Sequence, residues 1–102
     1  MDMKFLMKQA QEMQKKMEVI KEGLAHKEIK VTSGGGMIEL IINGQQEIKE
    51  IHIEPDIIDP EDKEMLEDLI LAAVNEGIRQ SKEMLNEEMM KLTGGINLPG
   101  LF

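Results

Sequence analysis

Apolar residues recur at alternating steps of four and three along the first quarter of the chain. The recurring positions are Leu6, Ala10, Met13, Met17, Ile20 and Leu24. This spacing places the apolar side chains in a heptad seam along one face of a helix. The pattern therefore predicts an amphipathic helix over residues 2–25 whose seam faces another protein surface.

Segments with a two-residue period follow this helix. The segment 26–33 alternates apolar and polar residues, and three consecutive glycines separate it from the segment 37–43. In this second segment a two-residue period puts Ile38, Leu40 and Ile42 on one face and Met37, Glu39 and Ile41 on the other. Alternation of this kind predicts two strands joined by a turn. Asn43 and Gly44 then predict a hairpin, since both residue types tolerate positive φ. A third strand is expected over 46–55.

The third strand departs from strict alternation. Its apolar residues Ile48, Ile51 and Ile53 are three and then two positions apart. One extra residue near Lys49 restores the two-residue period on both sides. We therefore expect a β-bulge or a bend at this position.

A long apolar stripe predicts a second helix. Asp59 suits the N-cap, Pro60 suits the first helical position, and the acids that follow favour the positive end of the helix dipole. The stripe continues to Leu92, and the glycine pair at 94–95 is expected to end the helix. Gly77 inside the stripe costs about 1 kcal/mol relative to alanine, which a close contact of the helix would explain.

The order of elements predicts an α+β fold: a helix, a three-stranded antiparallel β-meander and a long helix. The 102 residues suit a single domain over 1–102, with a flexible tail from about residue 96. The last helix, about 50 Å long, exceeds a strand of about 23 Å. Both helices should therefore overhang the sheet, and their free ends should project together.

Lone projecting helices with apolar stripes are unstable in water, so we expect a second copy to cover them in a homodimer. The expected dimer interface is the seam Leu6, Ala10, Met13, Met17, Ile20 and Leu24.

The sequence gives little support for catalysis or metal binding. There is no cysteine, which excludes disulfides, thiolate metal sites and thiol nucleophiles. His26 lies far from His52, and His52 with Glu54 is far more often a solvated pair than a metal site. Ser33 and Ser81 lie in no nucleophile motif, and the glycine run joins two strands, whereas a phosphate loop opens a helix. We expect no enzymatic activity, no cofactor and no metal.

Charge is distributed unevenly. The net charge is −8, yet residues 1–27 carry six lysines against four acids, giving +2. Residues 28–53 sum to −2 and residues 54–102 to −8. The first helix is therefore a mildly basic element on an acidic body. The lack of a long apolar run or a signal-peptide pattern favours a cytoplasmic protein without a membrane span.

Four sequence blocks resemble the YbaB/EbfC family of nucleoid-associated proteins. They are "LMKQAQEMQKKM", "GGGMIELIING", "EDKEMLEDLILAAVNEGIR" and the closing "LPG". The resemblance covers nearly the whole chain and implies an α-β-β-β-α protomer in a tweezer-like homodimer. It also implies duplex DNA binding by projecting helices, a role in bacterial nucleoid organisation and gene regulation, and a nucleoid-associated location.

The resemblance assigns the DNA contacts to the projecting helices, and the basic residues of the two helices are the candidates for these contacts. By position, these are Lys4, Lys8, Lys15, Lys16, Lys82 and Lys91. The ten methionines are more often core or dimer seam than a peptide-binding groove. The alternative is an acidic helical scaffold that binds a protein partner of replication or repair without contacting DNA. Salt-dependent binding to a duplex separates these two hypotheses.

Overall fold

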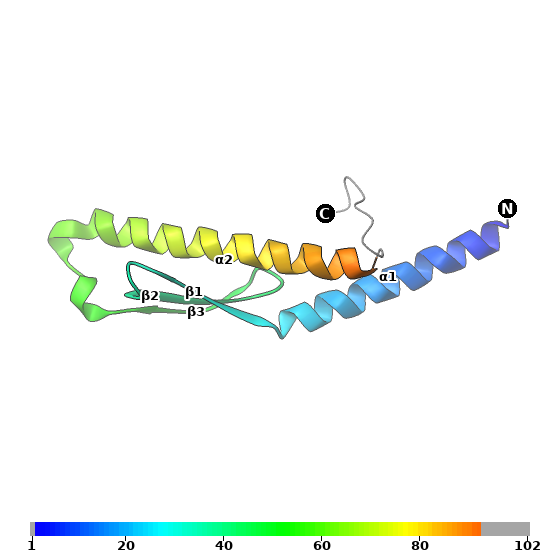
Figure 1. Cartoon of the computed structure of the whole chain (residues 1–102), viewed down its shortest axis with the longest axis horizontal. Helices are drawn as coiled ribbons and strands as arrows, with labels where there is room; N and C mark the ends of the chain where they lie inside the picture. Colours follow the sequence, from blue (N-terminus) through cyan, green and yellow to red (C-terminus); the bar gives the residue numbers. More distant parts are fainter. Residues whose placement is uncertain (1, 93–102) are drawn as a thin grey trace.

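Two helices and a three-stranded sheet form the described part of the chain, residues 2–92 of the computed structural model (Figure 1). The elements are α1 (Met3–Ala25), β1 (Glu28–Ser33), β2 (Ile38–Asn43), β3 (Ile48–Ile53), the 3₁₀ turns η1 (Pro55–Ile57) and η2 (Pro60–Asp62), and α2 (Lys63–Leu92). This order confirms the predicted α-β-β-β-α architecture. The predicted glycine stop at 94–95 and the predicted tail from 96 lie outside the described residues. Neither of the two described helices is long and apolar enough to cross a membrane.

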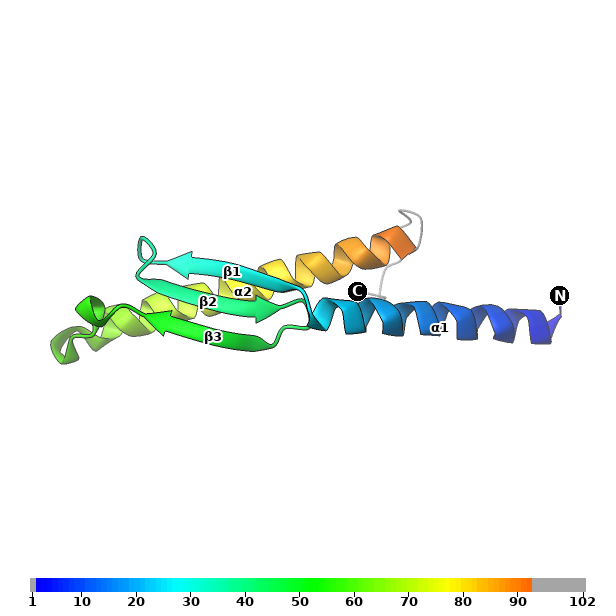
Figure 2. The same cartoon turned by 90° about the horizontal axis from the view of Figure 1, so that it is seen from below.

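The strands form an antiparallel meander in the order β1-β2-β3 (Figure 2). Along the central strand β2, the side chains of Ile38, Leu40 and Ile42 are fully buried. Because side chains alternate along a strand, these three share one face, and that face is the centre of the core. The predicted grouping of these three residues on one face of β2 is confirmed, and the structure shows that this face is the buried one.

The predicted irregularity of β3 is present. Ile41 pairs with Glu50, but the next residue along β2, Ile42, pairs with Ile48. Lys49 is therefore the extra residue of a β-bulge. The bulge keeps the three isoleucines of β3 on one face of the sheet, although their spacing is uneven.

α2 packs across β1 and β2 on the apolar face of the sheet. Its buried positions there include Ala73, Gly77 and Ser81, which lie four residues apart on one side of the helix. A Cβ on Gly77 would lie 3.0 Å from Leu40 Cδ2 and 3.3 Å from Ile42 Cγ2. Glycine therefore permits the close approach of helix and sheet, which explains its place inside α2.

The helical turn that leads into α2 begins where the capping residues predicted. The Asp59 carboxylate accepts a hydrogen bond of 3.0 Å from the Glu61 backbone N–H, and Pro60 opens the turn. The first turn is 3₁₀ and the regular α-helix starts at Lys63. A tighter 3₁₀ turn is common at a helix terminus, so the start is three residues later than the predicted first helical position.

Two serine hydroxyls join α2 to the sheet. Ser33 Oγ donates to the Leu69 carbonyl at 2.7 Å. Ser81 Oγ donates to the Asn43 carbonyl at 2.8 Å and accepts from the Gln46 N–H at 3.0 Å. The two bonds lie twelve positions apart along α2, since they involve Leu69 and Ser81. They therefore fix the position of the helix along the sheet.

α1 is attached to the sheet at the turn between β2 and β3. The Gly44 N–H donates to the carbonyls of Leu24 at 2.9 Å and Lys27 at 3.1 Å. A Cβ on Gly44 would lie 2.8 Å from Leu24 Cβ and 2.9 Å from Leu24 O. The residue with positive φ in this turn is Gln46, at 64°. The hairpin prediction has the right place but the wrong reason, because Gly44 serves close contact with α1.

Most of α1 projects beyond the rest of the molecule. Residues 3–16, which we call the α1 arm, are all exposed, and burial begins at Met17 and Ile20 near the contact with α2. In both views α1 continues past the end of α2. Both helices overhang the sheet as predicted. They do not project equally, because only α1 forms a separate arm.

Candidate nucleic-acid interface

The α1 arm concentrates positive charge. It carries Lys4, Lys8, Lys15 and Lys16 against a single acid, Glu12, giving +3. By contrast, α2 carries four basic and seven acidic residues, giving −3. The four arm lysines are exposed, and none belongs to an ion pair of the described chain. Their charges are therefore available to an external anion.

Helical spacing places three of these lysines on one side of the arm. With 3.6 residues per turn, Lys4, Lys8 and Lys15 fall within about 40° of each other. They lie opposite the apolar seam, and Gln11 lies between them. The row is about 16 Å long, which is enough to reach phosphates at more than one position. Lys16 lies about 100° away from Lys15, on the flank of the arm.

The two candidates on α2 do not form a comparable row. Lys82 and Lys91 are nine residues apart, which places them on opposite sides of the helix. Lys91 Nζ lies 3.3 Å from Glu88 Oε1, and Lys27 Nζ contacts the same oxygen at 3.3 Å. The hydrogen bonds from Lys27 and then Lys91 hold the pKa of Glu88 below its ordinary value of 4.5. Only Lys82 of this pair lacks an ion pair within the described residues.

The predicted dimer seam divides into two parts. Leu24 is buried inside its own chain, so little of its side chain is left for a partner, and its place in the dimer interface stays a prediction. Met17 and Ile20 are half-buried near the contact of α1 with α2. The exposed part of the seam lies on the α1 arm and consists of Leu6, Ala10 and Met13.

Comparison with known proteins identifies the family to which a chain with this basic arm belongs. The sequence model of the YbaB/EbfC DNA-binding family matches residues 1–96. The chain belongs to this family. Similar proteins include a nucleoid-associated protein of Ruminiclostridium cellulolyticum, 54% identical over 99% of this chain and 89% of the relative. Another is a nucleoid-associated protein of Alkaliphilus metalliredigens, 50% identical over 99% of this chain and 89% of the relative.

A solved structure shares the fold. The crystal structure of uncharacterized protein HP0035 from Helicobacter pylori superposes with a TM-score of 0.84 at 26% sequence identity. The match covers 92% of this chain and 99% of that chain. The resemblance and the α-β-β-β-α fold predicted from the sequence blocks are therefore confirmed.

In this YbaB/EbfC chain, the single arginine is already held within α2. Arg79 Nη1 donates to Glu83 Oε1 at 2.6 Å, and Arg79 Nε donates to Glu76 Oε2 at 3.0 Å. The hydrogen bond from Arg79, with a second from Gln80, lowers the pKa of Glu76 from its ordinary 4.5 to about 2. A guanidinium engaged by two carboxylates has no free fork for a base edge. The unpaired cations of the arm are all lysines.

The ion pairs of Arg79 should make the stability of the protein depend on pH in the acid range. Because the fold lowers the pKa of Glu76, its charged form stabilises the protein above about pH 4.5, and this is lost as the pH falls towards about 2. We expect Glu76→Gln to lose less stability than the parent between about pH 5 and about pH 3. Since the pair is exposed, added salt should shrink the difference. Urea-unfolding midpoints at one protein concentration measure it.

Glu67→Gln is the matched control, because Glu67 lies exposed on the same helix and belongs to no ion pair of the described chain. It should follow the parent. The same acid dependence in the parent and in Glu76→Gln would contradict the stabilising role of the network.

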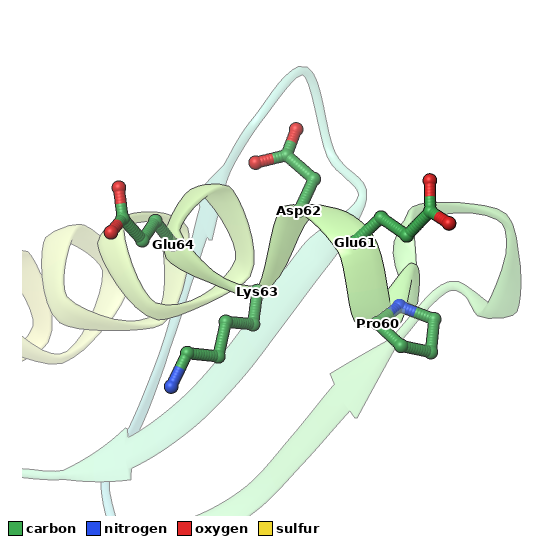
Figure 3. A pocket seen from close by; sticks show the side chains of 5 residues that line it. All are labelled: Pro60, Glu61, Asp62, Lys63 and Glu64. Carbon is green, nitrogen blue, oxygen red and sulfur yellow. The ribbon is translucent and has the colours of Figure 1, made fainter.

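A shallow hollow at the start of α2 is acidic but has no convergent ligands. Residues 60–64 line it, and Figure 3 shows the carboxylates of Glu61, Asp62 and Glu64 pointing apart. Among the residues that the structure describes, no group of three His, Cys, Asp or Glu is arranged to hold a metal ion. The acids lie at a helix N-terminus, where negative charge is favourable.

Proposed function

We propose that this chain is a nucleoid-associated protein that binds duplex DNA as a homodimer through its α1 arms. The observation that carries the proposal is the +3 charge of an exposed arm without internal ion pairs, in a chain of a DNA-binding family. Duplex DNA is a dense line of phosphates, and binding to it gains free energy when lysines release condensed counterions. The Lys4, Lys8 and Lys15 row is the main contact, and Lys16 is a flanking one.

Binding of this kind positions the protein without selecting a sequence. Lysine and glutamine side chains contact phosphate oxygens, and the row on the arm contains only these residue types with Gln11 between its lysines. Base-edge recognition relies mostly on fixed donor forks such as arginine, and Arg79 is engaged inside α2. The biological role that fits is nucleoid organisation, with gene regulation as its consequence, in the cytoplasmic nucleoid.

The acidic remainder of the molecule restricts where DNA can bind. The chain has a net charge of −8, so a dimer carries twice that, −16. Like charge repels the duplex from the acidic α2, whereas the arm attracts it. DNA is therefore expected to contact the arms and not the acidic α2.

We propose further that residues 1–102 form a single domain, and that this domain acts by binding alone, with neither catalysis nor a cofactor.

A salt titration of duplex binding tests the proposal. Each phosphate contact contributes about −0.9 to the slope of log affinity against log salt. Three row lysines on each of two arms predict a slope of about −5. Fluorescence anisotropy with two duplexes of unrelated sequence, at about 50 mM and about 150 mM salt, should give similar affinities and similar slopes. No binding to either duplex at about 50 mM salt would reject the proposal in favour of the acidic protein-binding scaffold.

A further inference from the structure

The chain is rich in methionine and lacks the other side chains that oxidants modify most readily. It has ten methionines but no cysteine, no tryptophan and no tyrosine. The thioether sulfur of methionine accepts one oxygen atom from an oxidant such as hydrogen peroxide and becomes a sulfoxide, which is polar and chiral. Oxidation of this chain is therefore directed to its methionines.

The structure separates these methionines by their exposure. Met3 is 70% exposed and Met7 is 58% exposed, the two highest values among the described methionines. By contrast, Met89 is 4% exposed. Because a peroxide reaches the sulfur from solvent, exposure sets the order in which the methionines react. Met3 and Met7 are therefore the most accessible thioethers of the described chain.

Both methionines belong to the first turns of α1, at the end of the arm farthest from the sheet (Figure 1). They are four residues apart, so they lie one above the other on the same side of the helix. Lys4 and Lys8 of the lysine row directly follow them in the sequence. The methionine side of the helix lies about 80–120° away from the centre of the lysine row. An oxygen atom added to either sulfur therefore changes the turns that carry two row lysines but lies to the side of those lysines.

The end of the arm depends on local interactions for its helical structure. Residues 3–16 are all exposed, so packing against other elements, which stabilises most protein helices, contributes little there. A cap supports the end, because the Asp2 carboxylate accepts a hydrogen bond of 3.0 Å from the Lys4 N–H. A helix of fewer than about 12–15 residues without packing is only marginally stable in water. The helix propensity of the arm residues therefore decides whether the end of the arm stays helical.

Sulfoxide formation lowers this helix propensity. Methionine is among the strong helix formers, because its unbranched side chain loses little freedom in a helix. A sulfoxide oxygen is a hydrogen-bond acceptor, and polar side chains that bond to nearby backbone N–H groups favour conformations other than the helix. An apolar pair at positions i and i+4 also supports a helix, and oxidation makes the Met3 and Met7 pair polar. Oxidation of both residues should therefore unwind the end of the arm.

We propose that Met3 and Met7 form a reversible oxidation site that controls the helical structure of the α1 arm and, through it, the affinity for DNA. In the reaction the sulfur attacks one oxygen of hydrogen peroxide, the S–O bond forms as the O–O bond breaks, and the other oxygen leaves as water. The sulfur is oxidised and the peroxide is reduced. Methionine sulfoxide reductases reverse the step, with a dithiol as the reductant that becomes a disulfide.

The effect on DNA binding rests on the proposed function, whereas the oxidation site and its effect on the helix do not. Lys4 and Lys8 share a side with Lys15 only while the arm is helical. The apparent affinity falls in proportion to the fraction of molecules that keep a binding-competent arm. Oxidation should therefore lower duplex affinity by at least about threefold.

Peptide mapping after graded exposure to hydrogen peroxide tests the site itself. Trypsin cuts after lysine, so Met7 falls in the peptide 5–8, and fragment ions of the peptides 1–4 and 83–91 resolve Met3 and Met89. Met3 and Met7 should gain oxygen first and Met89 last. In urea-unfolded protein, the control, the three rates should converge. Equal rates at Met7 and Met89 in the folded protein would overturn the proposal.

The double variant Met3→Leu, Met7→Leu tests the consequence. Leucine resembles methionine in helix propensity and volume and is not oxidised by peroxide. The variant should match the parent before treatment, and it should keep its helicity and duplex affinity at the dose that oxidises Met3 and Met7 of the parent. Met65→Leu, Met90→Leu, at exposed positions of α2, is the matched control and should lose both with the parent. Sulfoxide reductases should restore both.

Circular dichroism measures the helicity and fluorescence anisotropy measures the duplex affinity. An oxidised parent that keeps its helicity or its affinity overturns the proposal, and so does a Met3→Leu, Met7→Leu variant as sensitive to peroxide as the parent. A parent that binds no duplex before treatment overturns the control of DNA binding together with the proposed function. The peptide map and the circular dichroism then still decide the oxidation site and its effect on the arm.

Discussion

Changing Lys8, Lys15 and Lys16 together to alanine should lower the affinity for duplex DNA by about four-thousandfold near 0.1 M salt, because the row lysines Lys8 and Lys15 are lost from both arms of the dimer. At that concentration a slope of about 0.9 per phosphate-bound lysine corresponds to about eightfold in affinity for each such lysine removed. Alanine is the best helix former, and all three lysines are exposed, so helicity and dimer mass should not change. Fluorescence anisotropy at two salt concentrations measures both the affinity and the slope.

The single variants refine this expectation. Lys15 belongs to the row of the arm whereas Lys16 lies on its flank, so Lys15→Ala should reduce affinity and slope more than Lys16→Ala. A control that removes Lys30, Lys49 and Lys63 changes the net charge equally but leaves the arm untouched. It should bind nearly as well as the parent. Equal losses in the arm variant and this control would mean that overall charge, and no particular surface, governs binding. Unchanged affinity in the arm variant would move the contacts to Lys82 and Lys91.

The elements of this fold could be predicted because each carries its own period. The two-residue alternation of β2 and the four-and-three spacing of α1 are local consequences of strand and helix geometry. Even the bulge at Lys49 was predictable, because the uneven spacing of Ile48, Ile51 and Ile53 fits one sheet face only if one residue is extra.

The contacts that hold these elements together could not be predicted in the same way. The hydroxyls of Ser33 and Ser81 each bond to a backbone atom more than thirty positions away, and no local pattern marks such a partner. The partner of the apolar seam of α1 could not be predicted from a local pattern either. A seam shows that a helix faces protein, but not whether that protein is its own chain, and Leu24 proves to be buried within the protomer.

The sequence predicted which helix carries the candidate site, but not which of the candidate lysines lie together, exposed and without ion pairs. The excess of lysine in the first 27 residues predicts that the first helix is the basic element of the chain. The ion pair of Lys91 with Glu88, and the exposure of the whole arm, depend on how α1 and α2 lie against the sheet. The exposure of Ile48 and Ile51 on β3 was missed, because alternation predicts which residues share a face but not whether a helix covers them.

Replacing Gly44 by alanine should loosen the attachment of α1 and destabilise the protein by about 2–4 kcal/mol. The new Cβ would lie 2.8 Å from Leu24 Cβ and 2.9 Å from the Leu24 carbonyl oxygen, so α1 must move away. That movement stretches the Gly44 N–H bonds to the carbonyls of Leu24 and Lys27. It also strains the bond of 3.1 Å that Asn43 Nδ2 donates to the Ala25 carbonyl. Urea unfolding measures the loss.

The same variant should distinguish the orientation of the arm from its charge. Gly44→Ala removes no cation, so duplex affinity should fall while the slope of log affinity against log salt stays near that of the parent, unlike the lysine variants. Gly23→Ala is the matched control, because a Cβ there has nothing within 4 Å and alanine in a helix is favoured over glycine by about 1 kcal/mol. It should stabilise the protein and bind DNA like the parent. Equal stability of Gly44→Ala and the parent would show that α1 tolerates displacement at this turn. Duplex affinity like the parent's in a destabilised Gly44→Ala would show that the rigid attachment of the arm plays no part in binding.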